Sequence, residues 1–150
     1  MSTPAGPPAD GAAPPFSPTI ALLALTRTVE LPVSRILEQH GLTLRKYGVL
    51  GHISRSPGLS MSEIARRSGI TVQSVHTLIR SLADAGLVSS RVESSGLAAS
   101  IVVTAAGGAL LREIGAEVAA LDATVFADDE MRGLSEALAE VVERRRRSAD

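Results

Sequence analysis

Along most of the chain, hydrophobic residues recur every three or four positions, which is the spacing of an amphipathic helix. Capping residues and glycines divide this pattern into segments, because Ser, Thr and Asp favour helix starts and glycine favours helix ends. Pro32 lies inside the first segment and is expected to kink or break it. We expect helices over residues 18–39, 44–54, 61–68 and 72–85, a long helix from 105 through 125, and a last helix from 129 to 147.

The pattern changes to short β-branched runs after the fourth helix. Residues 87–93 and 99–104 flank the turn cluster 94–96, and this arrangement predicts a β-hairpin. The two preceding helices, 61–68 and 72–85, are separated by a tight turn that contains glycine, which is a helix-turn-helix pattern. The fold class is therefore expected to be mainly α-helical with one small hairpin.

The long helix carries a second rhythm, because its apolar residues step alternately by three and four positions. This heptad spacing indicates a helix–helix seam, which glycines weaken locally. The first helix is also strongly apolar, and in a chain of 150 residues we expect both surfaces to pair with a second copy. The seam consists of Leu111, Ile114, Val118, Leu121 and Val125, and the glycines are Gly107, Gly108 and Gly115.

Composition removes several classes of function. The chain has no cysteine, which excludes disulfides, thiolate nucleophiles and Cys-based zinc sites. Aromatic residues are only 2%, which disfavours the stacking platforms that bind single-stranded nucleic acid. No hydrolase, metalloprotease or dinucleotide-binding motif occurs, so we expect no enzyme activity and no cofactor. His40, His52 and His76 match no metal-ligand spacing, and no acidic residues group with them in sequence, so no metal site is predicted.

Charge is unevenly distributed, although the net charge is only −1. Residues 41–104 hold seven basic and three acidic residues, whereas both flanking segments hold more acidic than basic residues. A basic centre between acidic flanks indicates a polyanion-binding region, and the alternative is a cluster of solvated arginines without such a role. The first basic residue is Arg27 and no apolar run could span a bilayer, so a cytoplasmic protein without membrane contact is expected.

The order of these elements and several short motifs resemble the MarR family of winged helix-turn-helix transcription regulators. Residues 42–50 are similar to the family's L-T-x-x-x-Y-x-x-L motif, and residues 60–65 to its S-x-x-E-L-A motif. Residues 86–88 are similar to the G-L-V before the wing, and residues 104–107 to the end of L-T-x-x-G. The resemblance covers roughly residues 18–147.

The resemblance implies a winged helix-turn-helix flanked by dimerisation helices. Its parts would be a Pro-rich flexible tail at 1–17, an N-terminal dimerisation helix at 18–41, a DNA-binding lobe at 42–104 and C-terminal dimerisation helices at 105–150. The implied function is that of a homodimeric, ligand-responsive repressor. Its two recognition helices would enter successive major grooves of a pseudo-palindromic operator in double-stranded DNA, roughly 34 Å apart.

The outward face of the helix at 72–85 is the expected recognition surface, because Gln pairs with adenine and Arg with guanine or phosphate. An ordinary solvated helix face is the alternative. Hydroxyls and guanidinium groups nearby are candidate phosphate contacts, although Ser60 is expected mainly to cap its helix. Arg66 and Arg67 are adjacent, so they point about 100° apart and cannot both face DNA. The candidate DNA contacts are Ser60, Ser62, Arg66, Arg67, Gln73, Ser74, His76, Thr77, Arg80 and Arg91.

The resemblance also implies an apolar or aromatic small-molecule effector bound between the dimer region and the DNA-binding lobe. Such an effector would act by preferring a lobe spacing that does not fit DNA. The candidate pocket residues, taken from the first and second helices, are His40, Tyr47, His52 and Arg55.

The wing departs from the family pattern. Wings of this family usually carry an Asp and Arg cluster whose arginine enters the minor groove, whereas this chain has no charged residue between Glu93 and Arg112. Two hypotheses therefore stay open. One is a DNA-binding regulator, and the other is a protein of the same fold that no longer binds DNA and uses its inter-lobe cleft for small-molecule binding or catalysis.

Overall fold

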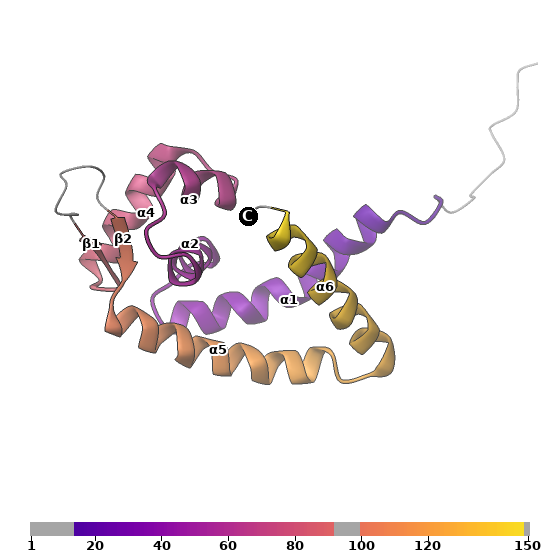
Figure 1. Cartoon of the computed structure of the whole chain (residues 1–150). Coiled ribbons are helices and arrows are strands. Elements are labelled where there is room, and N and C mark those ends of the chain that lie inside the picture. Colours follow the sequence, from indigo (N-terminus) through magenta and orange to yellow (C-terminus); the bar gives the residue numbers. More distant parts are fainter. Residues whose placement is uncertain (1–13, 92–99, 149–150) are drawn as a thin grey trace, which may run out of the picture.

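The computed structural model describes residues 14–91 and 100–148. Over these residues it contains six helices and one antiparallel hairpin, which is the predicted fold class (Figure 1). The residues of the predicted N-terminal tail up to 13 and the wing tip at 92–99 lie outside the described residues. The elements are α1 (Pro18–Gln39), α2 (Leu44–Arg55), α3 (Met61–Ser68), α4 (Val72–Asp84), β1 (Val88–Arg91), β2 (Ser100–Val103), α5 (Ala105–Val125) and α6 (Asp129–Arg147).

Each helix begins at a capping side chain, as the sequence predicts. The side-chain oxygen accepts a hydrogen bond from a backbone N–H of the first turn, which satisfies a donor that the helix itself leaves unpaired. Gly69 ends α3 with a φ of +64°, a conformation that glycine adopts without strain. The six N-cap residues are Ser17, Thr43, Ser60, Thr71, Thr104 and Asp128.

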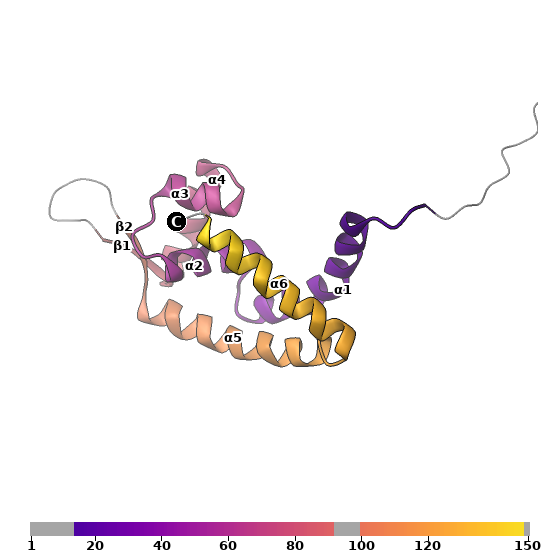
Figure 2. The same ribbon diagram turned by 45° about the vertical axis from the view of Figure 1, so that its right-hand side comes forward.

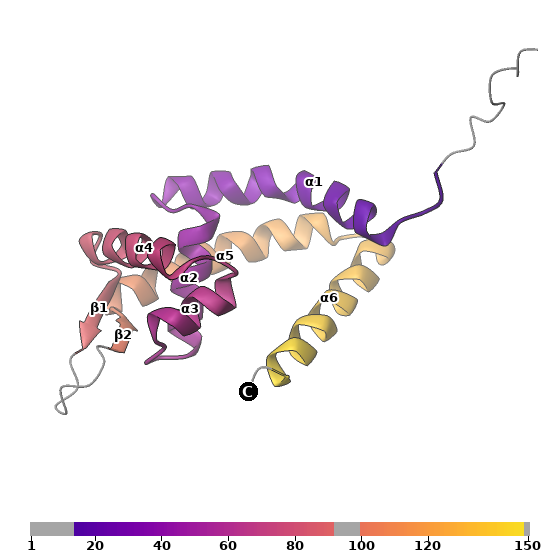
Figure 3. The same cartoon turned by 90° about the horizontal axis from the view of Figure 1, so that it is seen from above.

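Pro32 does not break α1. The helix runs continuously from Pro18 to Gln39, and it bends along its length (Figure 3). Proline removes one backbone hydrogen bond from the helix. The turns that follow Pro32 are held by packing, because Leu37 is fully buried and Ile36 lies against the same core.

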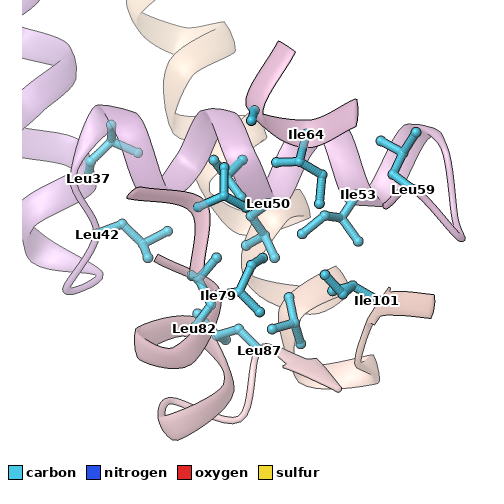
Figure 4. Close-up of a cluster of buried hydrophobic side chains, with 14 of the residues drawn as sticks. Leu37, Leu42, Leu50, Ile53, Leu59, Ile64, Ile79, Leu82, Leu87 and Ile101 are labelled. Carbon is cyan, nitrogen blue, oxygen red and sulfur yellow. The ribbon is translucent and has the colours of Figure 1, made fainter. Parts of the chain in front are cut away.

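One hydrophobic core joins α2, α3, α4 and the hairpin to the end of α1 and the start of α5 (Figure 4). The hairpin contributes the buried side chains of Val88 and Ile101 to this core, and its backbone register pairs Val88 with Val103 and Ile101 with Ser90. Burial of this kind contributes roughly 1.5–3 kcal/mol for each large aliphatic side chain. The largest fully buried side chains are Leu37, Val49, Leu50, Ile53, Ile64, Val75, Leu82 and Ile114.

The base of the hairpin is fixed to the start of α5. Thr104 donates a hydrogen bond from its hydroxyl to the carbonyl of Gly86 (2.7 Å) and one from its backbone N–H to the carbonyl of Leu87 (3.0 Å). Gly107 packs directly against this junction, since a Cβ there would lie 2.2 Å from the Leu87 oxygen. The wing and the long helix therefore meet at a contact that only glycine fits.

The outer helices are packed much less completely. In Figures 1 and 2, α5 runs along one side of the lobe and α6 turns back from its far end. Of the predicted heptad seam only Ile114 is buried within the chain, and α6 has no buried residue. Among the described helices, none has the length and hydropathy needed to cross a membrane.

Candidate nucleic-acid interface

The helix-turn-helix is formed by α3 and α4, which lie on the side of the lobe opposite α5 (Figure 1). The turn between them is short because Gly69 ends one helix and Thr71 caps the next. The apolar side of α4 is anchored in the core by Val75 and Leu82. That anchoring holds the opposite side of α4 toward solvent, where a helix of this motif reads DNA.

The solvent side of α4 presents the predicted recognition residues. Gln73, His76, Thr77 and Arg80 are all exposed, and Gln73 and Arg80 lie seven positions apart, which places them about two turns apart on one face. The Thr77 hydroxyl donates to the Gln73 carbonyl (3.2 Å), a local bond within the helix. Arg80 forms no ion pair with any residue that the structure describes, so its guanidinium is available to an anion.

Ser74 has a different position from its neighbours. Its side chain is half-buried, and its hydroxyl lies 2.9 Å from the hydroxyl of Thr71. Its backbone N–H donates to the same Thr71 oxygen (3.1 Å). Ser74 therefore forms part of the start of α4 as well as being a candidate contact.

On α3, Ser60 is engaged in a capping box. Its Oγ accepts from the Glu63 N–H (3.2 Å), and its own N–H donates to the Glu63 carboxylate (2.8 Å). Hydrogen bonds from the Ser60 backbone and hydroxyl lower the pKa of Glu63. Ser62, by contrast, is exposed on the first turn. The interpretation of Ser60 mainly as a cap agrees with these bonds.

The two adjacent arginines of α3 point to different surroundings. Arg67 donates from Nη1 to the Ser56 hydroxyl (2.9 Å), at the end of α2. Arg66 is exposed and forms no such bond within the described parts of the chain. Arg66 is thus the arginine of this pair that remains free for a phosphate. The backbone of Arg91 pairs with Ser100 in the hairpin.

Two arginines, Arg55 at the end of α2 and Arg67 on α3, lie close to His52. His52 on α2 is partly buried, and burial together with the charges of Arg55 and Arg67 lowers the pKa of His52. The imidazole is therefore held toward its neutral form.

A groove of about 520 Å³ runs between α2 and the end of α3. Of the four predicted pocket residues only His52 lines it, whereas Tyr47 is half-buried against the core and His40 lies at the contact between α1 and α5. The Ser68 hydroxyl, which lines the groove, is buried and has no hydrogen-bond partner among the described residues. The lining residues are Leu44, Arg45, Gly48, Val49, His52, Arg67, Ser68, Gly69 and Ile70.

One histidine does have acidic neighbours, which corrects the sequence argument. His40 Nε2 lies 2.6 Å from Glu117 Oε1, and a carboxylate oxygen of Glu113 is within 4.8 Å of both. His40 and Glu117 are 77 positions apart, so spacing along the chain gave no sign of this cluster.

Together, the capped α3–α4 pair, the exposed face of α4 and the adjoining hairpin define a winged helix-turn-helix protein. A sequence model described as MarR family matches residues 40–96. The HTH-type transcriptional repressor Rv2887 of Mycobacterium tuberculosis (strain H37Rv) is 43% identical over 96 residues, which is 63% of this chain and 69% of that protein. The chain belongs to the MarR family, as its motifs predict.

Solved structures agree with this assignment. The crystal structure of Rv2887 in complex with DNA superposes with a TM-score of 0.70 at 32% identity, covering 84% of this chain and 98% of that one. The complex of Rv2887 with salicylic acid gives a TM-score of 0.68 at 35% identity, covering 85% and 98%. The MepR–DNA complex of S. aureus, with a TM-score of 0.65 at 19% identity over 86% and 96% of the two chains, shows the shared fold.

Proposed function

We propose that this protein is a homodimeric, DNA-binding transcriptional repressor whose DNA affinity responds to a small aromatic acid. The observation that carries the proposal is the exposed face of α4, where Gln73 and Arg80 stand free on the second helix of a capped helix-turn-helix. The name of Rv2887 as a repressor and its crystal structure with DNA support the same function. Such a regulator acts on DNA in the cytoplasm and is not an enzyme.

The residues divide into two groups by their surroundings. Gln73, His76 and Arg80 point outward from α4 and would reach base edges or phosphates in the major groove. Ser62 and Arg66 on α3 would contact phosphates, because a helix N-terminus and a guanidinium both favour anions. Thr77, Ser74, Ser60 and Arg91 complete the proposed interface, and the first three also form hydrogen bonds within α3 and α4 or at their starts. Arg67 is left out of it, because its guanidinium donates to Ser56 and only one of the two adjacent arginines can face DNA.

Dimerisation would cover apolar surface that a single chain leaves exposed on its outer helices. The apolar side chains of Leu22 and Leu23 on α1, and of Val141 and Val142 on α6, are exposed to solvent in the single chain. Exposed apolar surface on this scale marks an interaction site. Pairing α1, α5 and α6 with a second copy would cover it and would hold two α4 helices at the spacing of successive major grooves. The lobe would then span residues 42–104, between dimerisation segments at 18–41 and 105–150.

The groove between α2 and α3 is the proposed effector site. Arg45 and Arg67 would bind a carboxylate, and the unpaired hydroxyl of Ser68 would accept or donate a further hydrogen bond. Leu44 and Ile70 would cover an aromatic ring. Rv2887 has been crystallised with salicylic acid and with p-aminosalicylic acid, which supports an acid of this class.

A titration against the gene's own upstream DNA tests the function. Fluorescence anisotropy with a labelled upstream fragment should show saturable binding that a shuffled fragment of equal length does not match. Binding should weaken as salt rises, because phosphate contacts release counterions. Arg80→Ala on α4 should weaken this binding. Its matched control is Arg132→Ala, which removes an arginine on α6 and should leave DNA binding unchanged.

The effector is tested in the same assay by adding salicylate, which should release the upstream fragment, whereas benzyl alcohol, which lacks the carboxylate, should not. Absence of DNA binding at every salt concentration, with salicylate still bound, would favour the alternative of a MarR-fold protein that has lost DNA binding. Absence of both would remove the proposed function.

A further inference from the structure

We propose that His40, Glu113 and Glu117 form a binding site for a divalent transition-metal ion, with Zn²⁺ as the best fit. His40 closes the C-terminal end of α1, and the two glutamates lie four residues apart on α5, which places them on one face of that helix. In Figure 1, α1 and α5 run side by side, and they are in contact along this face. The fold thus brings three ligand groups from two helices together.

The distances fit a common ion. One ligand atom from each residue lies within 4.8 Å of the other two, and the shortest pair, His40 Nε2 and Glu117 Oε1, is 2.6 Å apart. Ligand atoms that bond Zn²⁺ at about 2.0–2.2 Å in a tetrahedron lie about 3.4 Å from one another. That value falls between the two observed limits, so side-chain rotations alone can bring the three atoms to one ion.

The donor set selects the class of metal. One imidazole nitrogen with two carboxylate oxygens suits Zn²⁺ and its neighbours in the first transition row, whereas Ca²⁺ and Mg²⁺ prefer oxygen ligands throughout. A divalent cation would also balance the negative charge of the two carboxylate ligands. Without an ion, these carboxylates have only the His40 ring nitrogen between them as a polar partner among the described residues.

The site is partly enclosed and partly open. The His40 side chain is only 14% exposed, and its position is fixed because its backbone N–H donates to the carbonyl of the fully buried Leu37 (3.0 Å). Glu113 is exposed, which leaves a path for the ion and room for water as a fourth ligand. Three protein ligands and one open position are a recurring zinc arrangement.

An ion here would join the end of α1, which leads directly into α2 of the lobe, to the long helix α5. It would therefore fix the lobe relative to the helices proposed for dimerisation. Binding itself does not depend on DNA, so it can be tested apart from the proposed function.

The test is a Co²⁺ absorbance titration of the full-length protein with any affinity tag removed, followed by displacement with Zn²⁺. We expect one equivalent per chain and visible bands of tetrahedral Co²⁺, which Zn²⁺ abolishes. Glu113→Gln and Glu117→Gln should each weaken Zn²⁺ binding on the order of 10- to 100-fold. Asp122→Asn, which removes an exposed carboxylate further along the same helix, should bind as the unaltered protein does.

Glu113 is exposed, so its substitution leaves the fold intact, and a thermal melt of each variant checks this directly. Two outcomes would overturn the proposal. One is the lack of saturable Co²⁺ or Zn²⁺ binding by the unaltered protein at 100-fold excess. The other is an equal affinity of Glu113→Gln, Glu117→Gln and Asp122→Asn, which would assign any binding to surface carboxylates in general.

Discussion

The winged lobe and the outer helices use hydrophobic residues in opposite ways. In the lobe, Leu50, Ile53 and Ile64 are at most 1% exposed, and every helix contributes to one core. In α6 no residue is buried, and Leu138 on its apolar face is 41% exposed. The lobe is thus complete within one chain, whereas α6 and the first half of α1 are not. Folding and assembly therefore depend on different residues, and substitutions can separate them.

The largest expected effect lies in the core. Leu50→Ala should lower the free energy of unfolding by about 2–5 kcal/mol, because it leaves a cavity among side chains that cannot fully collapse. Leu138→Ala removes the same side-chain atoms from α6. It should lower the free energy of unfolding of the lobe far less, because Leu138 lies outside the lobe core and is 41% exposed. Urea denaturation at a fixed protein concentration, monitored by circular dichroism, measures both, and equal losses would remove the distinction between the two regions.

Two neighbouring glycines at the junction between the wing and α5 allow a more direct comparison of variants. Gly107→Ala should destabilise the protein by about 1–3 kcal/mol, because the new Cβ would collide with the Leu87 carbonyl. Gly108→Ala is the matched control, since its Cβ would lie 3.7 Å from the Arg112 guanidinium. It should be neutral or stabilising by up to about 1 kcal/mol. Thermal melts of the two variants should therefore shift in opposite directions or by clearly different amounts.

On the DNA-binding side of the lobe, Arg80→Ala and Gln73→Ala should each cost about 1–3 kcal/mol of binding if these residues read bases. The lobe should remain folded, because both side chains are exposed. Anisotropy titrations with upstream and random DNA measure the effect. A loss that is equal on both fragments would assign the residue to phosphates, and no loss from either change would place α4 outside the interface.

The wing makes a related prediction. Residues 94–99 supply no cation, so Leu97→Arg should strengthen DNA binding and steepen the dependence of log K on log salt by up to about 2 units per dimer. Titrations between low and physiological salt give this slope. An unchanged slope would show that α3 and α4 carry the phosphate contacts without the wing.

The smallest effect concerns pH. Burial, Arg55 and Arg67 lower the pKa of His52, so the folded state binds fewer protons there than the unfolded chain. Stability from this group is present above the ordinary histidine pKa of about 6.5 and is lost as the pH falls through the lowered value. His52→Gln should flatten the stability profile between pH 5 and 7, as measured by urea midpoints. Arg55→Gln should flatten it in part, and an unchanged slope in both variants would contradict the assignment.

Local features of the fold could be predicted from the sequence because they depend on neighbouring residues. Thr43, Thr71 and Thr104 cap helices through bonds that span three positions, and these starts are confirmed. The continuity of α1 through Pro32 could not be predicted in this way, since the packing of Leu37 in the core carries the helix past the proline. Prediction from neighbouring residues fails where packing between distant segments of the chain decides the structure.

The candidate sites show the same difference between local and long-range features. The exposed face of α4 follows from its apolar spacing, so Gln73 and Arg80 could be placed on it from the sequence alone. The contact of His40 with Glu117 could not be found, because it depends on how α1 crosses α5. The heptad spacing of α5 predicts a seam, in which Ile114 is buried and Leu111 and Val118 pack in part against the core of the same chain. Only the remaining seam residues, Leu121 and Val125, depend on a second copy for cover.

Sedimentation equilibrium of the full-length protein at micromolar concentration tests the central claim most directly. Because the apolar faces of α1 and α6 have no cover within the chain, the account predicts a single species of twice the chain mass. Val142→Glu on α6 should shift that species toward one chain mass while the lobe keeps its helical signal. A stable, folded species of one chain mass for the unaltered protein would contradict the account.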